Sequence, residues 1–314
     1  MKKNHEYYVS KIILKEFNES PIRITRMTIG IVNEVYLVVL KNKEIIVRLN
    51  KNKDLILGSS KYIPLYSSKG IKVPEILVEN YSKKVIHYCY QILSKIEGKD
   101  IDKVISKLSN KELKEIAKEI ANIIMKLRKI PTNREFGYVR TKEKNLFNSW
   151  SDYMNNMIKE IEKNNKKTKV LDKNTLDILN ELLIKYKDYF DKVKSEFYYD
   201  DLSSKNVMIN KGKFNGIVDL DGAMYGDPIE AIGRIKASWC GKYYGEFYTS
   251  AVIKELKLDN TQKKMVTVYA IFNLVGWMCE TGDFNANVSK EIDWNEVKKD
   301  KEKLNKLYNE LSKK

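Results

Sequence analysis

The hydrophobic pattern of this chain changes its period near Gly98. Before Gly98, two short segments rich in β-branched residues, Val35 to Leu40 and Glu44 to Leu49, flank a lysine-containing turn, which is typical of a β-hairpin. After Gly98, apolar residues recur three and four positions apart, as on one face of a helix. The change predicts an α+β chain, with a strand-rich part over residues 1–97 and a larger, mainly helical part over residues 98–314.

Two further elements are predicted in the N-terminal part. The apolar segment from Val85 to Leu93 can add a strand to the hairpin. Between the hairpin and this strand, Lys61 to Lys69 can form a helix that ends at Gly70. A sheet with one accompanying helix therefore forms the expected N-terminal part.

Helices dominate the prediction after Gly98. The pattern Ser109-x-x-Glu112 is a capping box that begins a helix, and Pro131 lies beyond its expected end. A second helical stretch covers about Leu171 to Val193. A third, Met265 to Cys279, is apolar nearly all round. At this length it is too short to span a membrane.

Composition places the chain among globular proteins. It has 314 residues, of which 43% are hydrophobic and 11% aromatic, enough for a sizeable core and for two medium domains. No run of about 18 uncharged apolar residues occurs, so we expect no membrane segment and a cytoplasmic location. Cys89, Cys240 and Cys279 are widely spaced and show no disulfide or metal pattern, which favours buried thiols.

The formal net charge of +16 raises the question of nucleic-acid binding, because clustered Lys and Arg bind phosphate backbones. The charge is not clustered, however. Residues 1–97 hold 17 Lys and Arg against 9 Asp and Glu, and the remainder holds 41 against 33, so both parts carry the same excess. This even spread is typical of a solvated surface. We expect no nucleic-acid partner and a monomer.

One window, Glu196 to Ala231, is net negative, with seven acids and three lysines. It contains the pattern D-x4-N-x12-D formed by Asp201, Asn206 and Asp219, with two apolar segments, Val207 to Ile209 and Phe214 to Leu220, between the last two. Phosphoryl transfer needs a carboxylate that orients the attacking hydroxyl and oxygen ligands that hold Mg²⁺ against the phosphates. The alternative is that these residues are a turn acid, a cap and a loop carboxylate.

The same window resembles a known family. YYDDLSSKNVMI followed by GIVDLDGAMYGDP is similar to the H-x-D-x4-N and I-D-x-x-x-A-x-x-G-D-P signatures of the aminoglycoside phosphotransferase and choline kinase superfamily. The resemblance implies Asp201 as the catalytic base, Asn206 and Asp219 as Mg²⁺ ligands, and Asp227 as an acid that holds the following loop. It also implies a protein-kinase-like bilobal fold, with a small antiparallel-sheet N-lobe and a larger helical C-lobe.

The resemblance extends into the N-terminal part. IRITRMTIGIVNEVYLV is similar to a nucleotide-positioning loop, which would include Gly30 and Asn33. KEIIVRL is similar to the third strand, where Arg48 stands in place of the lysine that grips the phosphates. YQILSKIEGKDI is similar to the hinge, so the base of ATP or GTP would hydrogen-bond to backbone near Ser94 to Ile96. The implied reaction moves the terminal phosphoryl group to a hydroxyl of a small molecule.

Departures from the family pattern leave alternatives open. Tyr199 replaces the usual histidine, and Asp200 replaces a small residue. No acid stands at Ser59 or Ser60, where the family's ion-pairing glutamate would fall, so the orientation of Arg48 is unexplained and a surface arginine is an alternative. A second hypothesis is a nucleotide-binding protein without turnover. A third, a nucleic-acid-binding module, rests on charge alone.

The acceptor is predicted from the acidic window. A cationic aminoglycoside-type antibiotic gains from carboxylates in a cleft, and Asp200, Asp227 and Glu230, with Glu280 and Asp283, could supply them. The function would then be antibiotic resistance. The alternative is a metabolite acceptor of the choline, methylthioribose or homoserine type, with Asp227 bracing a loop, Glu230 at a helix N-terminus and Asp200 facing solvent.

Overall fold

The computed structural model of the chain describes residues 5–27, 33–140, 146–280 and 291–312. The chain forms two compact units. The first consists of Met1–Glu97 together with Arg140–Lys142 and Asn215–Gly222, and the second of Gly98–Val139, Glu143–Phe214 and Ala223–Lys314. A short return of the chain, Asn215–Gly222, thus brings Asp219 into the unit that contains the N-terminal strands.

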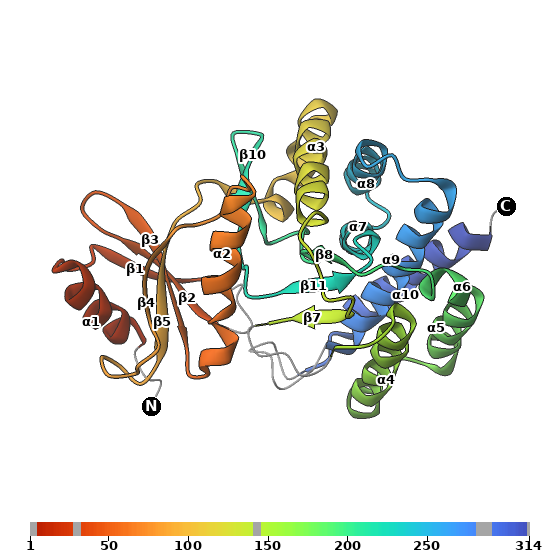
Figure 1. The fold of residues 1–314 in the computed structure, drawn as a ribbon, viewed down its shortest axis with the longest axis horizontal. Coiled ribbons are helices and arrows are strands. Elements are labelled where there is room, and N and C mark those ends of the chain that lie inside the picture. The colour runs from red at the N-terminus through yellow and green to blue at the C-terminus, as the bar shows by residue number, and fades with distance from the viewer. Residues whose placement is uncertain (1–4, 28–32, 141–145, 281–290, 313–314) are drawn as a thin grey trace. The chain divides into compact units, whose positions relative to one another are not determined.

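The first unit is built on an antiparallel sheet with the strand order β1-β2-β3-β5-β4 (Figure 1). The predicted hairpin is confirmed, because β2 and β3 pair with Glu34 opposite Leu49 and Val39 opposite Glu44. Its strands are β1 (Arg23–Met27), β2 (Glu34–Val39), β3 (Glu44–Asn50), β4 (Ile76–Asn80) and β5 (Cys89–Ser94).

Helices α1 (His5–Phe17) and α2 (Gly58–Ser68) lie on opposite faces of this sheet (Figure 1). Side chains alternate along β3, so Ile45 and Val47 join the core that α1 closes. Arg48 points to the other face, where its guanidinium reaches Ser59 of α2. Because side chains alternate along β3, the buried guanidinium of Arg48 lies on the α2 side of the sheet.

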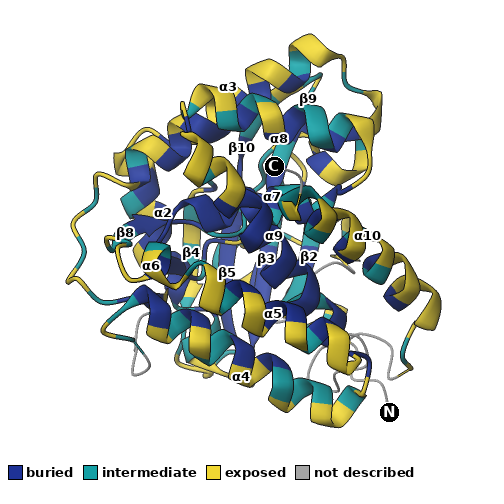
Figure 2. Cartoon of the chain, turned by 90° about the vertical axis from the view of Figure 1, so that its right-hand side faces the viewer, coloured by how far each residue is buried: buried dark blue, intermediate teal, exposed yellow. Residues whose placement is uncertain are grey.

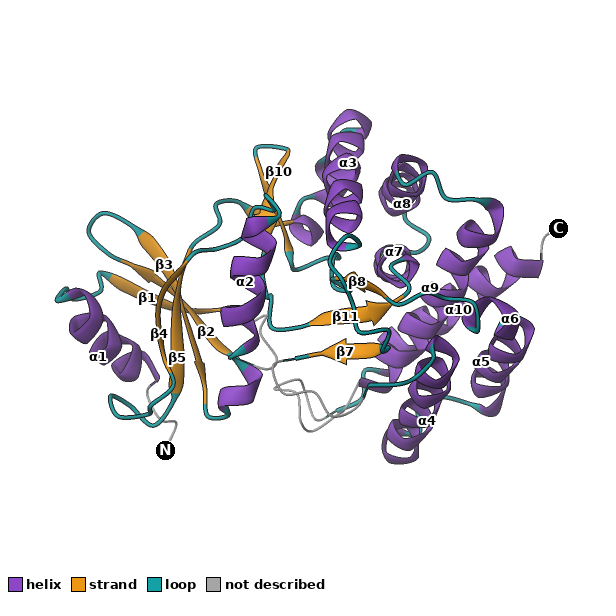
Figure 3. Cartoon of the chain, viewed as in Figure 1, coloured by secondary structure: helices purple, strands orange, loops and turns teal. Residues whose placement is uncertain are grey.

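The second unit is mainly helical (Figure 3). The stretch of α9 from Met265 to Cys279 is apolar nearly all round, as predicted, and most of it is buried (Figure 2). The capping box of α3 is present, with Ser109 as N-cap and Glu112 at its third position. The helices are α3 (Asn110–Leu127), α4 (Trp150–Thr168), α5 (Lys173–Lys185), α6 (Lys187–Phe190), α7 (Ile229–Ser238), α8 (Tyr243–Glu255), α9 (Asn260–Glu280) and α10 (Trp294–Ser312).

Two small sheets position the acidic window. One has the order β7-β11-β8 and the other β10-β9-β6. The loop that carries Asp201 and Asn206 runs from β8 to β9, and Asp219 follows β10. The strands are β6 (Lys99–Asp100), β7 (Gly137–Val139), β8 (Glu196–Tyr198), β9 (Val207–Asn210), β10 (Lys213–Ile217) and β11 (Ala223–Gly226).

Three predicted elements have different bounds in the structure. The strand expected from Val85 begins at Cys89, because Ile86 and Tyr88 are buried against the α1 core without joining the sheet ladder. The helix expected over 171–193 is two helices, α5 and α6, which meet at Tyr186, where φ is −107° and ψ is 15°. The strand expected to reach Leu220 ends at Ile217, because Asp219 has a φ of 64° and cannot continue a strand.

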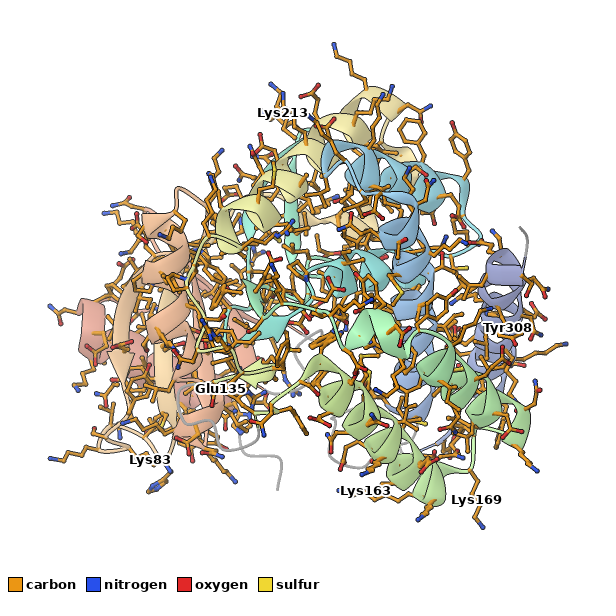
Figure 4. All side chains as sticks on the ribbon, turned by 45° about the vertical axis from the view of Figure 1, so that its right-hand side comes forward. Lys83, Glu135, Lys163, Lys169, Lys213 and Tyr308 are labelled. Carbon is orange, nitrogen blue, oxygen red and sulfur yellow. The ribbon has the colours of Figure 1, made fainter. Side chains whose placement is uncertain are left out.

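Exposed lysines are distributed over separate parts of the surface. Lys83, Lys163, Lys169 and Lys213 are examples that can be followed in Figure 4. No helix in the described ranges combines the length and the apolar character needed to cross a bilayer. Cys89, Cys240 and Cys279 are buried free thiols, as predicted.

Candidate active site

The side chain of Asn206 forms hydrogen bonds within the loop from β8 to β9. Its side chain is 5% exposed, and Nδ2 donates to the hydroxyl of Tyr199 at 3.1 Å and to the backbone oxygen of Asp201 at 3.3 Å. Tyr199, which replaces the histidine of the similar motif, thus anchors the asparagine. With both amide hydrogens engaged by the loop, Oδ1 of Asn206 is left as the atom that can ligate a cation.

Asp201 offers its carboxylate at the surface of the same loop. Its side chain is 36% exposed. Ser203 Oγ donates to Oδ1 at 3.1 Å, and the guanidinium Nε of Arg234 lies 3.5 Å from the same oxygen. A carboxylate that is held on one oxygen and open to solvent can accept a proton from a bound hydroxyl.

Asp219 lies in the first unit, directly after β10. Its left-handed φ of 64° is unusual for a residue other than glycine, and its side chain is 60% exposed. Oδ1 lies 3.4 Å from Arg48 Nη2. Backbone strain of this kind is found at ligand-holding positions.

Arg48 is buried, with 5% of its surface exposed, so the alternative of a surface arginine is wrong. Its Nη1 donates to Ser59 Oγ at 2.6 Å, to Asp221 Oδ1 at 3.2 Å and to Gln91 Oε1 at 3.3 Å. Nη2 forms an ion pair with Asp221 Oδ2. Asp221 and Ser59 therefore supply the orientation that the missing glutamate would give.

The N-terminus of α2 holds Asp221 in place. Ser59 donates to Asp221 Oδ1 from its backbone N–H, at 3.3 Å, and from its hydroxyl. A carboxylate at a helix N-terminus is stabilised by the unpaired N–H groups and the helix dipole. A Cβ on Gly58 would lie 1.8 Å from the backbone oxygen of Asp221, so only glycine permits this approach. Burial opposes the charge of Arg48, yet Asp221 and Asp219 keep its pKa raised.

The predicted nucleotide-contacting residues have different environments. Gly30 lies outside the described residues. Asn33 is buried, donates from Nδ2 to Asp221 Oδ2 at 3.1 Å and accepts at Oδ1 from Asn50 Nδ2 at 2.8 Å. Its amide therefore braces the Arg48 and Asp221 pair.

Ser94 is the last residue of β5, and Ile96 lies two residues beyond it. The backbone N–H of Ser94 donates to Glu75 O at 2.9 Å, and its hydroxyl accepts from Glu75 N at 2.8 Å. Ile96 is half-buried, and within the described ranges no hydrogen bond engages its backbone. The contact of Ile96 with a nucleotide base therefore stays a prediction.

Two further acids of the window, Asp227 and Glu230, accept hydrogen bonds from other residues of the protein. Asp227 accepts from the hydroxyls of Tyr189 and Tyr269, both at 2.8 Å, and from the backbone N–H of Ile229, the first residue of α7, at 3.0 Å. Burial raises its pKa. Glu230, in the first turn of α7, accepts from Asn273 Nδ2 at 2.8 Å and from the Tyr198 hydroxyl at 3.3 Å. These two acids brace the loop and the helix.

Asp200 does not face solvent. Its side chain is 17% exposed and accepts from Arg234 Nη1 at 2.9 Å. Burial raises the pKa of Asp200, although Arg234 opposes the shift. The alternative of a solvent-facing Asp200 is wrong, because its charge is neutralised by an arginine of α7. Asp283 lies outside the described residues.

The donor chemistry of the predicted metal ligands suits Mg²⁺. Asn206 offers an amide oxygen and Asp219 an exposed carboxylate, and the ion prefers a few such oxygens completed by water and phosphate. Among the described residues no group of three or more His, Cys, Asp or Glu side chains could hold a metal by itself. Each of the two residues therefore has a donor type that Mg²⁺ prefers.

Two functional partners were not identified from the sequence pattern, Asp221 for Arg48 and Arg234 for Asp201. One signal was available. Only seven of the 58 basic residues are arginine, and arginine is favoured over lysine in buried pairs with carboxylates. Arg48 and Arg234 are two of these seven, and each contacts acids of the motif.

The chain resembles known proteins in fold and matches one family model. A search of curated proteins found no match. Among solved structures, a thermostable mutant of aminoglycoside phosphotransferase APH(4)-Ia has a TM-score of 0.74 at 14% identity, covering 97% of this chain and 100% of that one. The GDP complex of aminoglycoside 2'-phosphotransferase-IIIa has a TM-score of 0.71 at 16% identity, covering 98% and 99%.

A candidate fructosamine-3-kinase from Haemophilus somnus 129PT has a TM-score of 0.64 at 14% identity, covering 95% of this chain and 96% of that one. These likenesses confirm the predicted kinase-like α+β fold. The model of the phosphotransferase enzyme family matches residues 23–255, which include Arg48, Asp201, Asn206 and Asp219 but not Tyr269 and Asn273 of α9. This chain belongs to the phosphotransferase enzyme family.

Proposed function

We propose that the protein is a Mg²⁺-dependent phosphotransferase that moves the terminal phosphoryl group of ATP or GTP to a hydroxyl of a small molecule. The observation that carries the proposal is the Asp201 and Asn206 loop. Its asparagine uses both amide hydrogens within the protein and keeps Oδ1 for a ligand, while its aspartate is open to solvent. Family membership supports the same reaction class.

Each residue has a defined part in this reaction. Asp201 accepts the proton of the acceptor hydroxyl, whose oxygen forms the new bond to the terminal phosphorus. The bond from that phosphorus to the bridging oxygen breaks, and its electron pair leaves with the nucleoside diphosphate. Asn206 and Asp219 would hold Mg²⁺, which neutralises phosphate charge when bound.

Nucleotide binding is assigned to the first unit. Arg48, held by Ser59 and Asp221, offers a guanidinium to phosphate oxygens, and such forks bind phosphate bidentately. The backbone near Ser94 to Ile96, at the end of β5, would hydrogen-bond to the edge of the base. Solved structures with similar folds contain ADP, AMP-PNP or GDP, which supports a nucleotide donor and leaves ATP and GTP as equal candidates.

An aminoglycoside-type antibiotic is the first acceptor class to test, because structures of similar fold are aminoglycoside phosphotransferases, one of them with hygromycin B. A metabolite acceptor is the alternative, and one observation favours it. Asp200, Asp227 and Glu230 are paired or hydrogen-bonded inside the protein, so these acids are not available to a cationic acceptor.

The test is a coupled assay of nucleotide consumption with ATP or GTP, with and without Mg²⁺, against aminoglycosides and hydroxylated metabolites. The proposal expects acceptor-dependent consumption that needs Mg²⁺ and a phosphorylated product by mass spectrometry. Tight Mg²⁺-dependent nucleotide binding with no transfer to any acceptor would instead indicate a nucleotide-binding protein without turnover.

A further inference from the structure

Arg234 of α7 contacts two consecutive carboxylates. Its Nη1 donates to Asp200 Oδ2 at 2.9 Å, and its Nε lies 3.5 Å from Asp201 Oδ1. All three residues belong to the second unit. One guanidinium therefore spans the acid that departs from the family pattern and the acid that is assigned as the base.

The place of Arg234 is set by helix packing. Its neighbour Gly233 faces α9, where an added Cβ would lie 2.5 Å from Tyr269 Cβ. This close approach of α7 and α9 fixes the backbone beneath Arg234. On its other side, the Arg234 guanidinium carbon lies 5.6 Å from the ring centre of Trp277 on α9, a cation–π distance. The side chain is thus held by two helices and directed at the loop.

The hydrogen bonding of Arg234 is incomplete. Its Nε is buried and has no hydrogen-bond partner among the described residues, although Asp201 Oδ1 lies within ion-pair distance. An unsatisfied buried donor is rare and calls for an explanation such as a catalytic role. Burial opposes the charge, but Asp201, Asp200 and Glu230 keep the pKa of Arg234 raised, so the guanidinium stays protonated.

Resting on the proposed function, we propose that Arg234 is a positioning residue that holds the Asp201 carboxylate in the orientation that receives the acceptor hydroxyl, with Asp200 as the counter-charge that anchors Arg234. A carboxylate torsion is broad when nothing restrains it. Arg234 and Ser203 both contact Oδ1, which leaves Oδ2 for the incoming proton. Arg234 transfers no proton itself.

A purely structural role makes a different prediction. If Arg234 only neutralises buried Asp200, then removing both charges together restores the protein. The test therefore compares Arg234→Gln with the double variant Asp200→Asn/Arg234→Gln. Lys236→Gln is the matched control, since Lys236 is on the same helix and pairs with Glu310 at 2.7 Å.

For the positioning role, Arg234→Gln lowers both the melting temperature and kcat, the latter by about 100-fold, as for a base displaced by about 1 Å. The double variant regains the melting temperature but stays at least about 10-fold below wild type in kcat. The Kd for Mg²⁺-nucleotide is unchanged in both, and Lys236→Gln keeps wild-type kcat. A double variant that regains kcat together with stability would overturn the proposal.

A readout without activity separates this inference from the proposed function. Crystal structures of the wild type and the double variant should differ in the side-chain torsion of Asp201, while β8 and β9 superimpose. An unchanged Asp201 would refute the positioning role whatever the assay shows. If the wild type transfers phosphate to no acceptor, the proposed function is wrong. The contact between Arg234 and Asp201 then has no catalytic role.

Discussion

Arg48 Nη1 lies 3.2 Å from Asp221 Oδ1, and this pair joins residues 173 positions apart in the sequence. Both side chains are largely buried, with 6% and 13% exposed. A buried cation needs a partner, because burial removes its hydration. Asp221 therefore takes the place of the helical glutamate that the family pattern has near Ser59.

The first prediction concerns the stability of this pair. Asp221→Ala leaves Arg48 buried without its main counter-charge, which should cost about 3 kcal/mol or more. Hydrogen exchange of the β3 amides measures the opening free energy of the first unit. The double variant Arg48→Met/Asp221→Ala should lose less than Asp221→Ala alone, and an equal or greater loss would contradict the assignment of the pair.

The second prediction concerns the approach of α2 to Asp221. Gly58→Ala places a Cβ 1.8 Å from the backbone oxygen of Asp221, so α2 or the loop must move and the Ser59 hydrogen bonds lengthen. We expect a lower melting temperature and weaker nucleotide binding. Gly276→Ala is the control, because its Cβ meets no described atom within 4 Å. Equal behaviour of the two variants would show that the close approach is unimportant.

The third prediction concerns the proposed base. Asp201→Asn should lower kcat by about 10²- to 10⁴-fold, because a general base acts in the transition state. Nucleotide affinity, measured by calorimetry, should stay near the wild-type value. Wild-type turnover by Asp201→Asn would exclude the assigned role.

The fourth prediction concerns the metal. Asp219→Ala should remove the Mg²⁺ dependence of nucleotide binding, because a metal ligand contributes in the ground state as well as in the transition state. Calorimetry with and without Mg²⁺ compares the variant with wild type. If the two proteins bind Mg²⁺-nucleotide equally well, Asp219 is not a ligand.

The fifth prediction follows from Glu230. Burial, and next the Asp200 charge, raise its pKa from 4.5 to about 7. Between these values the folded state keeps a proton that the unfolded state releases, so stability falls as pH rises through this window. Above pH 7 the loss reaches roughly 3 kcal/mol at 1.36 kcal/mol per pKa unit.

Glu230→Gln removes this dependence. The melting temperature of the variant should rise relative to wild type as pH increases from 5 to 8. Glu119→Gln, which changes an exposed acid of α3, should show no such trend. A constant difference between Glu230→Gln and wild type across this range would show that Glu230 does not titrate there.

Local elements were well predicted where a local signal exists. The turn and β-branched residues around Lys41 indicate the β2–β3 hairpin, and Ser109 with Glu112 indicates the start of α3. The predicted bounds of helices and strands were wrong where tertiary packing decides them. Ile86 and Tyr88 belong to the hydrophobic core beside α1. In the sequence, this run of buried residues has the same pattern as a strand.

The sequence by itself determined the candidate chemistry. The spacing of Asp201, Asn206 and Asp219, with apolar segments between, predicts a loop and a hairpin, and these are local arrangements that a short stretch of chain can encode. The same spacing carries the family resemblance. The reaction class could therefore be proposed before any coordinates were known.

Only the tertiary structure decided which residues contact each acid of the window. Asp200, Asp227 and Glu230 were predicted to attract a cationic acceptor, whereas they contact Arg234, Tyr269 and Asn273. These partners come from α7 and α9 and lie 34, 42 and 43 positions after the acids that they contact. A carboxylate is an open binding group or a buried structural one depending on its surroundings, and residues distant in the sequence supply those surroundings.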